Sequence, residues 1–353
     1  DGAGGARPQG WGMGAHLRAV ALAVAVAFGS LSAGPPPLAA ADFAYADFEL
    51  VDGLHFQGVS NQTQDWLRLT PSRPGTSGAV WFHSKQTVIG GFSTEFRFRI
   101  TLDDDQALPG PCKFGEQQPK SCARRGGDGL VFVLHNSASH ALGEGGADLG
   151  YGGIANGVAV ELDTWFDAHA RDPYENHVAV LTRGRELLRS DHGSHLGSSL
   201  GVPDLLDGEA HAVRVEYDPE FHAAAVRHPS FQAAPHLASL VYPKGVAWKH
   251  GLGTLRVFVD HLDEPALTVP LNLGAILDLD AGRAWVGFTS STGAAYQNHD
   301  VLSWRFLERK AESFSTAARA GAHLRPDQDA PPQLGARWGD PLFHRTNTLP
   351  EGA

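Results

Sequence analysis

The sequence has few cysteines, few basic residues and no long apolar segment in its main part. Two cysteines in 353 residues are too few for a four-thiolate zinc site or a disulfide-dense scaffold. The chain has 28 Lys and Arg against 39 Asp and Glu, a formal net charge of −11, which argues against nucleic acid or an anionic membrane as the main partner. Beyond the amino end, no stretch reaches the ~20 apolar residues that a transmembrane segment needs.

Glycine and proline, in contrast, are abundant, with 42 and 22 residues, whereas methionine occurs once. Many turn formers predict short strands joined by loops, and hence an all-β sandwich or barrel. Apolar and polar residues alternate at 96–100, 211–217 and 254–260, which is typical of strands with one buried face. Nearly continuous apolar runs at 130–134 and 158–162 indicate strands covered on both faces. These patterns favour an antiparallel β-sandwich.

The amino end has the order of features found in export signals. Arg18 is followed by an apolar run from Ala19, and the small residues Ala39 to Ala41 close the segment. A charge, a short apolar stretch and a small-residue cleavage site predict a signal peptide, with upstream residues before it, over residues 1–41. We therefore expect a protein that is secreted or lies in the lumen of the secretory pathway.

The remainder of the chain is predicted to form one domain and a tail. Residues 42–308 alternate strand-like runs with turn residues, and a sandwich of this size is permitted as a single domain. Residues 218–249 lack periodicity between two good strands, so we expect a loop insertion there. Residues 309–353 have little apolar content, which predicts a disordered carboxy-terminal tail.

Two covalent features agree with the secretory route. Cys112 and Cys122 are close in the chain, and an oxidising compartment would allow a disulfide between them. Asn61 begins the sequence Asn-Gln-Thr, an N-glycosylation acceptor, which predicts a glycoprotein.

The most informative segment is acidic. Glu161 and Asp163 are two residues apart on a predicted strand, so their side chains share one face. The loop that follows adds Asp167 and Asp172, and His177 begins the next strand. Ca²⁺ takes six to eight oxygen ligands, whereas an imidazole with carboxylates suits Mn²⁺ or another transition metal. Two adjacent ions that share carboxylates would explain both ligand types; the alternative is a solvated acidic loop after a strand.

This segment resembles the L-type, or legume-like, lectins, whose fold is the concanavalin A-like jelly roll. The match covers the spacing of six positions and five of their six residue types: Glu161, Asp163, Trp165, Asp167, Asp172 and His177. The resemblance implies that Asp163 and Asp172 bridge two ions. It places Asp167 and the carbonyl of Trp165 on the Ca²⁺ side, and Glu161 and His177 on the side of Mn²⁺ or another transition metal.

Other segments follow the same family in order. Residues 127–134 resemble the strand that bears a sugar-binding Asp, here Asp128, and the family implies a cis peptide between Gly127 and that residue. The glycine pair before Leu149 resembles a loop whose amide donates to a sugar oxygen, with Gly146 as the donor. Residues 294–300 resemble the specificity loop. The implied carbohydrate-binding residues are Asp128, Gly146, Trp165, Asp167 and Ala295.

One departure from the family pattern bears on the ligand. The family has Asn where this chain has Asp167, and an ionised Asp keeps the metal-binding oxygen but donates no hydrogen bond. Metal binding is therefore expected to persist while sugar preference changes. The predicted function is metal-dependent carbohydrate binding, and the short specificity loop favours mannose- or glucose-type glycans as ligands. Glycans or glycoproteins would be the partners, and the fold is compatible with a homo-oligomer.

Two other function classes remain open at this stage. Glycan hydrolases on a similar sandwich carry Glu-x-Asp-x-x-Glu on one strand, which supplies two catalytic carboxylates. Here Glu161 and Asp163 begin that pattern, but Phe166 stands where the second Glu is needed, so we predict no enzyme activity. The third class is a structural or adhesion domain whose metals only stabilise the fold.

Overall fold

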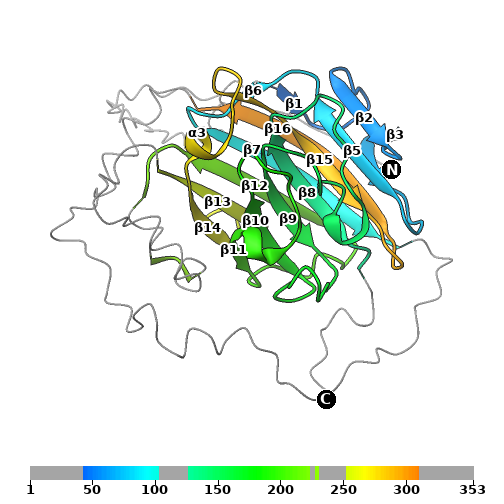
Figure 1. Ribbon diagram of the computed structural model, residues 1–353. Coiled ribbons are helices and arrows are strands. Elements are labelled where there is room, and N and C mark those ends of the chain that lie inside the picture. The colour runs from blue at the N-terminus through cyan, green and yellow to red at the C-terminus, as the bar shows by residue number, and fades with distance from the viewer. Residues whose placement is uncertain (1–42, 103–125, 223–226, 230–251, 310–353) are drawn as a thin grey trace, which may run out of the picture. The chain divides into compact units, whose positions relative to one another are not determined.

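Two antiparallel β-sheets stack face to face in the computed structural model (Figure 1). The structure describes residues 43–102, 126–222, 227–229 and 252–309. The first sheet has the order β14 (Leu267–Leu271), β13 (Gly253–Val259), β12 (Ala210–Asp218), β7 (Phe92–Thr101), β16 (Asn298–Glu308), β4 (Trp66–Thr70) and β3 (Asn61–Thr63), with β1 (Phe43–Tyr45) paired to β16.

The second sheet carries the acidic segment. Its order is β11 (His195–Ser199), β10 (His177–Thr182), β9 (Gly157–Asp163), β8 (Gly129–His135), β15 (Arg283–Ser291), β5 (Ser77–Phe82) and β2 (Leu54–Gly58), with β6 (Gln86–Thr87) paired to β15. The helical elements include α3 (Leu273–Ile276) and two 3₁₀ turns, η2 (Gly146–Asp148) and η3 (His192–Ser194). The predicted all-β antiparallel sandwich is thus confirmed.

The inner faces of the two sheets share one hydrophobic core. On β7 the side chains of Phe96, Phe98 and Ile100 are buried, whereas Arg97 between them is exposed, as the alternation predicts. Removing these large apolar side chains from water is the main force that holds the sheets together. Trp304 of β16 is buried in this core and donates its indole N–H to Thr94 Oγ1 at 2.9 Å.

The second sheet is covered on its outer face as well. Every residue of β8 and β9 is buried. The outer face packs under a smaller apolar cluster that includes Trp81, Val131, Leu149 and Tyr151. Because β8 and β9 are buried on both faces, their sequences are nearly continuous apolar runs. Burial on both faces also means that a polar side chain on the outer face of β9 lies in a dry environment.

Several predictions fall wholly or partly outside the described residues. The signal peptide over 1–41, the pairing of Cys112 with Cys122 and the tail beyond Arg309 lie there, and they stay predictions. Most of the insertion at 218–249 lies there too, although β12 ends at Asp218 and β13 begins at Gly253. No helix within the described ranges has the length and apolarity needed to cross a membrane.

Asn61, the predicted glycosylation site, is the first residue of β3 and is exposed. Its side-chain oxygen accepts a hydrogen bond from Thr63 Oγ1 at 2.6 Å. An exposed acceptor is a requirement for glycosylation, and the modification stays a prediction.

Candidate functional site

The β9–β10 hairpin brings the acidic residues together. Antiparallel pairing sets His177 opposite Asp163, and Ala179 opposite Glu161. Leu162, between the two acidic residues, belongs to the core between the sheets, so Glu161 and Asp163 point to the other face. Both carboxylates and the imidazole are at most 5% exposed.

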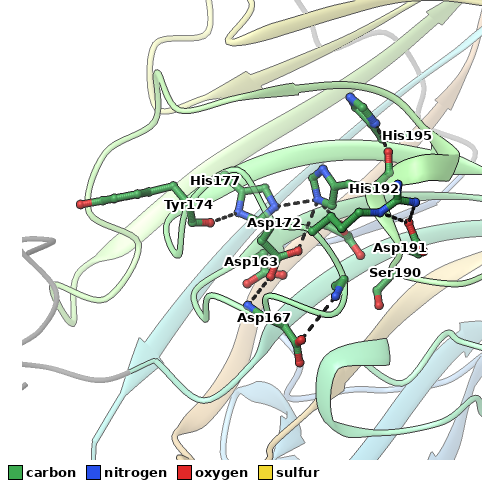
Figure 2. Close-up of polar contacts among 12 residues, drawn as sticks. Asp163, Asp167, Asp172, Tyr174, His177, Ser190, Asp191, His192 and His195 are labelled. Atoms are coloured by element: carbon green, nitrogen blue, oxygen red, sulfur yellow. Dashed lines mark hydrogen bonds and ion pairs between the residues drawn. The ribbon is translucent and has the colours of Figure 1, made fainter. Parts of the chain in front are cut away.

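The loop between the two strands folds back over this face and adds a third carboxylate. Asp172 is buried, and ligand atoms of Asp163, Asp172 and His177 all lie within 4.8 Å of one another. Asp172 Oδ2 accepts the backbone N–H of Asp167 at 2.6 Å (Figure 2). Asp163 Oδ1 accepts the backbone N–H of Trp165 at 2.8 Å. The carboxylates therefore fix the loop as well as lining the cluster.

Asp167 and Trp165 sit on this loop with part of their surface open. Asp167 Oδ1 accepts the backbone N–H of His169 at 2.8 Å and that of Ala170 at 3.3 Å, as in an Asx turn. Neither of these bonds uses Asp167 Oδ2. Both residues are partly buried, and Phe166 between them is 50% exposed.

A second imidazole completes the cluster, and the sequence reasoning missed it. His192, in η3, lies with its Nε2 3.2 Å from His177 Nε2 and 3.6 Å from Asp172 Oδ1 (Figure 2). Ligand atoms of Glu161, His177 and His192 are likewise all within 4.8 Å of one another. No periodic pattern links His192 to the hairpin, because its place depends on how η3 packs against the loop. The only signal in the sequence is a histidine shortly after β10.

Burial sets the protonation of the cluster. It raises the pKa of Glu161 and of Asp163 well above the ordinary range, and repulsion from Asp172 adds to both shifts. Burial also raises the pKa of Asp172 to about 7 and lowers the pKa of His177 to about 4. The imidazole is therefore neutral at pH 7 and ready to ligate, while the carboxylates lack a positive partner.

The chemistry of the cluster fits divalent cations. Tyr151 donates its hydroxyl to Glu161 Oε1, but Glu161 Oε2 is buried without a hydrogen-bond partner among the described residues. A buried carboxylate oxygen with no partner is costly, and a cation would satisfy it. Three carboxylates with neutral imidazoles form a donor set that suits Ca²⁺ on the oxygen-rich side and a transition metal on the nitrogen-bearing side.

The raised pKa of Asp172 predicts a pH dependence of cation binding. A cation needs the ionised carboxylate, and below pH 7 it must displace a proton from Asp172. We expect apparent cation affinity to fall about tenfold per pH unit between pH 7 and 5 for each displaced proton. Calorimetric titrations at several pH values between 7 and 5 measure this. Constant affinity from pH 7 to 5 would contradict the assignment.

Asp128 lies beside this cluster at the start of β8. It is 6% exposed, and burial raises its pKa to about 6, with the charge of Asp167 contributing to the shift. Its backbone carbonyl accepts the N–H of Thr164 at 2.9 Å and the Thr164 hydroxyl at 3.1 Å. Thr164 directly follows Asp163, so the position of Asp128 is tied to the start of the acidic loop.

The Gly146 loop meets Asp128 through one serine. Ser291 Oγ lies 2.8 Å from the carbonyl oxygen of Gly146 and 3.4 Å from Asp128 Oδ2. Gly146 has φ 62°, and no atom lies within 4 Å of where a Cβ would stand. A backbone that is open to solvent and free of a side chain allows close approach by a ligand.

The loop between β15 and β16 closes the other side of Asp128. A Cβ built on Gly293 would lie 3.2 Å from Asp128 Oδ1, so this loop passes against the carboxylate. Ala295, farther along the loop, is partly buried. The predicted loop over 294–300 is too long, because β16 begins at Asn298 and its first residues pair with Thr101 and Ile100 of β7.

The predicted cis peptide between Gly127 and Asp128 is wrong for this structure. The described residues contain no cis peptide bond, and Asp128 instead has a left-handed φ of 58°. The chain turns into β8 through that residue and through Gly129, whose φ is 146°.

Gly127 is packed too tightly for a side chain, which gives a testable prediction. A Cβ there would lie 2.5 Å from the Cα of Tyr296, and the Gly127 N–H donates to Gln297 Oε1 at 3.0 Å. Gly127→Ala is expected to push the β15–β16 loop away, to cost about 1–3 kcal/mol of stability and to weaken ligand binding while cation affinity stays. Thermal unfolding and calorimetry measure these effects.

Gly90→Ala is the matched control for this variant, since the nearest atom to its Cβ position is 3.9 Å away. Equal stability of the Gly127→Ala and Gly90→Ala proteins would contradict the packing argument.

A model of the legume lectin domain matches residues 40–320 of this chain. The chain belongs to the legume lectin family. The resemblance found in the sequence is thereby confirmed, and membership of this family favours carbohydrate binding.

Two curated relatives are plant receptor kinases. The chain is 26% identical to the L-type lectin-domain containing receptor kinase I.3 of Arabidopsis thaliana, over 55% of this chain and 26% of that protein. It is 27% identical to the L-type lectin-domain containing receptor kinase SIT1 of Oryza sativa subsp. japonica, over 50% of this chain and 24% of that protein. This lectin chain therefore spans about a quarter of the length of these relatives.

Among solved structures, a lectin from Bauhinia forficata in complex with GalNAc is similar in fold. It has a TM-score of 0.50 and 18% identity, and the match covers 75% of this chain and 96% of that one. At this identity the similarity concerns the fold alone.

Proposed function

We propose that this legume lectin domain binds carbohydrate in a site whose loops are held in place by two cations. The observation that carries the proposal is the bonding of Thr164, next to Asp163 in the acidic cluster, to the backbone of Asp128. Asp128 is in turn linked through Ser291 to the Gly146 loop. Order in the cluster would thus fix the backbone position of Asp128, whose carboxylate would bind sugar.

The proposed ligands of the two ions follow the family pattern. Asp163 and Asp172 bridge the ions, Asp167 and the carbonyl of Trp165 complete the Ca²⁺ side, and Glu161 and His177 belong to Mn²⁺ or another transition metal. The ions supply positive charge that balances the buried carboxylates and so fixes the loop at 164–176. They take no part in a reaction. The fit of the cluster to cations, rather than any bound ion, supports this assignment.

The proposed sugar site consists of Asp128, Gly146, Trp165, Asp167 and Ala295. Asp128 accepts hydrogen bonds from sugar hydroxyls, and its charge strengthens them. The Gly146 N–H is free of a side chain that would block a sugar oxygen, and Trp165 offers an aromatic face. A shallow site of this kind competes with water, so preorganised groups are needed for affinity. Mannose- or glucose-type glycans, free or on glycoproteins, are the proposed ligands.

A location outside the cell or in the secretory lumen is part of the proposal. It is supported by the signal-like residues 1–41, by the exposed acceptor Asn61 and by the family to which the chain belongs.

A glycan array tests the function. The protein is applied with Ca²⁺ and Mn²⁺ in one arm and with a chelator in the other. We expect binding to a defined glycan class that chelation abolishes. Failure to bind any glycan with both ions present would favour a structural or adhesion domain, and release of free sugar from the bound glycan would favour a hydrolase. Either outcome would overturn the proposal.

A further inference from the structure

We propose that His192 is a protein ligand of the transition-metal ion, so that this position is built from two imidazoles. The inference rests on the cation pair proposed above and adds a residue to the pattern read from the sequence. The 3₁₀ turn η3 places His192 beside the β9–β10 hairpin, where the residue is 7% exposed. Its consequence concerns which metal the protein selects.

The distances fit one ion between the side chains. Two nitrogens that are each about 2.1 Å from a zinc-sized ion lie roughly 3.0–3.4 Å apart when they are neighbouring ligands. The Nε2 atoms of His177 and His192 are 3.2 Å apart. In an octahedral site with ligand distances of about 2.1 Å, two ligands on opposite sides of the ion lie about 4.2 Å apart. His192 Nε2 and Glu161 Oε2 are 4.0 Å apart.

The hydrogen bonds around His177 decide which of its atoms is free to ligate. Its Nδ1 lies 2.6 Å from the carbonyl oxygen of Tyr174 (Figure 2). A carbonyl only accepts, so Nδ1 carries the proton and Nε2 of the neutral ring carries a lone pair. That lone pair points at His192.

His192 faces more acceptors than a single proton satisfies. Its Nε2 lies 3.2 Å from His177 Nε2, 3.6 Å from Asp172 Oδ1 and 4.0 Å from Glu161 Oε2. A proton on His192 Nε2 would serve one of them, whereas Glu161 Oε2 is buried with no hydrogen-bond partner among the described residues. A divalent cation bound between these side chains would satisfy them at once.

The position of His192 is fixed by its backbone. Its N–H donates to the carbonyl of Ala170 at 2.8 Å, in the same loop as Asp172. Asp191 caps η3 by accepting the N–H of Gly193 at 2.6 Å, and it also pairs with Arg171. The loop that carries His192 and the loop that carries Asp172 are therefore fastened together before any ion binds, as a preorganised site requires.

A second imidazole changes metal preference. Imidazole suits Zn²⁺, Ni²⁺ and Cu²⁺, whereas oxygen-rich sites suit Mn²⁺ and Ca²⁺. We therefore expect the position between Glu161, His177 and His192 to favour Zn²⁺ over Mn²⁺. Loss of His192 should reduce that preference and leave the Ca²⁺ position, which has no nitrogen ligand, unchanged.

Calorimetric titration tests the role of His192. The metal-stripped protein is loaded with Ca²⁺ and titrated with Zn²⁺ or Mn²⁺, in parallel with His192→Ala and with His169→Ala, an exposed histidine of the neighbouring loop as the control. We expect His192→Ala to lose at least tenfold in Zn²⁺ affinity, to lose less for Mn²⁺ and to bind Ca²⁺ as before. Wild-type Zn²⁺ affinity in His192→Ala would overturn the role of His192 alone. Absence of any transition-metal site in the wild-type protein would overturn the cation pair as well.

A spectrum of the wild-type protein tests whether His192 binds the ion without relying on a variant that has to fold. Electron paramagnetic resonance of the Cu²⁺-loaded protein counts the imidazole nitrogens bound to the ion. Two coupled nitrogens are expected. One nitrogen would overturn the proposal.

Discussion

Asp128→Asn is expected to abolish sugar binding while leaving Ca²⁺ affinity nearly intact. The buried carboxylate is placed to accept two hydrogen bonds from sugar hydroxyls, and Asn replaces one acceptor with a donor and removes the charge. A hydrogen bond to a charged group contributes about 1.5–3 kcal/mol, so the loss of both corresponds to roughly a hundredfold or more in affinity. Sugar titration by calorimetry, alongside a Ca²⁺ titration, measures the two affinities in one preparation.

Asp263→Asn is the matched control, because Asp263 is an exposed residue of the turn between β13 and β14. That protein should bind sugar and Ca²⁺ as the wild type does. Parallel loss of sugar and Ca²⁺ in Asp128→Asn would mean that Asp128 belongs to the metal cluster rather than to the sugar site.

Asp163→Ala is expected to remove both ions and, with them, sugar binding. Asp163 is close enough to Glu161 and Asp172 to be repelled by both, and it is the residue proposed to bridge the ions. At one hundred times its dissociation constant, each bound ion stabilises the folded wild-type protein by about 2.7 kcal/mol. The variant should gain none of this. Thermal unfolding with and without ions measures the difference.

The behaviour in chelator separates the loss of ions from general damage. In the ion-free wild type, burial and the neighbouring carboxylates hold the pKa of Asp163 well above its usual range, so its charge is unfavourable there. Truncation relieves that repulsion, at the cost of the hydrogen bond that Asp163 accepts from the Trp165 N–H. We expect the stability gap between the two proteins to be small in chelator and to widen with added ions. Two binding sites in the calorimetric titration of the variant would contradict the bridging role.

The strands and the acidic cluster were predictable because both depend on local periodicity. Glu161 and Asp163 share a face on any strand, and a hairpin that returns at His177 must bring that histidine back beside Asp163. Likewise, the continuous apolar runs of β8 and β9 follow from burial on both faces. For residues that are close in sequence and lie on paired strands, the spacing in the sequence determines which side chains are neighbours.

The remaining parts of the site depend on contacts between distant segments, which spacing does not encode. His192 reaches the cluster through the packing of η3 on Ala170. Ser291 meets Asp128 because β15 pairs with β8 in a register that sets Ser291 opposite Gly129. The expected cis peptide came from the family rather than from the residues of this chain, and the left-handed φ of Asp128 replaces it.

We propose that the β9–β10 hairpin and its loop enclose two cations that shape a sugar site. A crystal structure grown in excess Ca²⁺ and Mn²⁺, with anomalous scattering recorded to locate the metals, tests it most directly. We predict two adjacent peaks, one beside Asp167 and the carbonyl of Trp165 and the other between Glu161 and His177, both in contact with Asp163 and Asp172. Ordered water alone between Glu161 and His177, with no anomalous signal, would contradict the account.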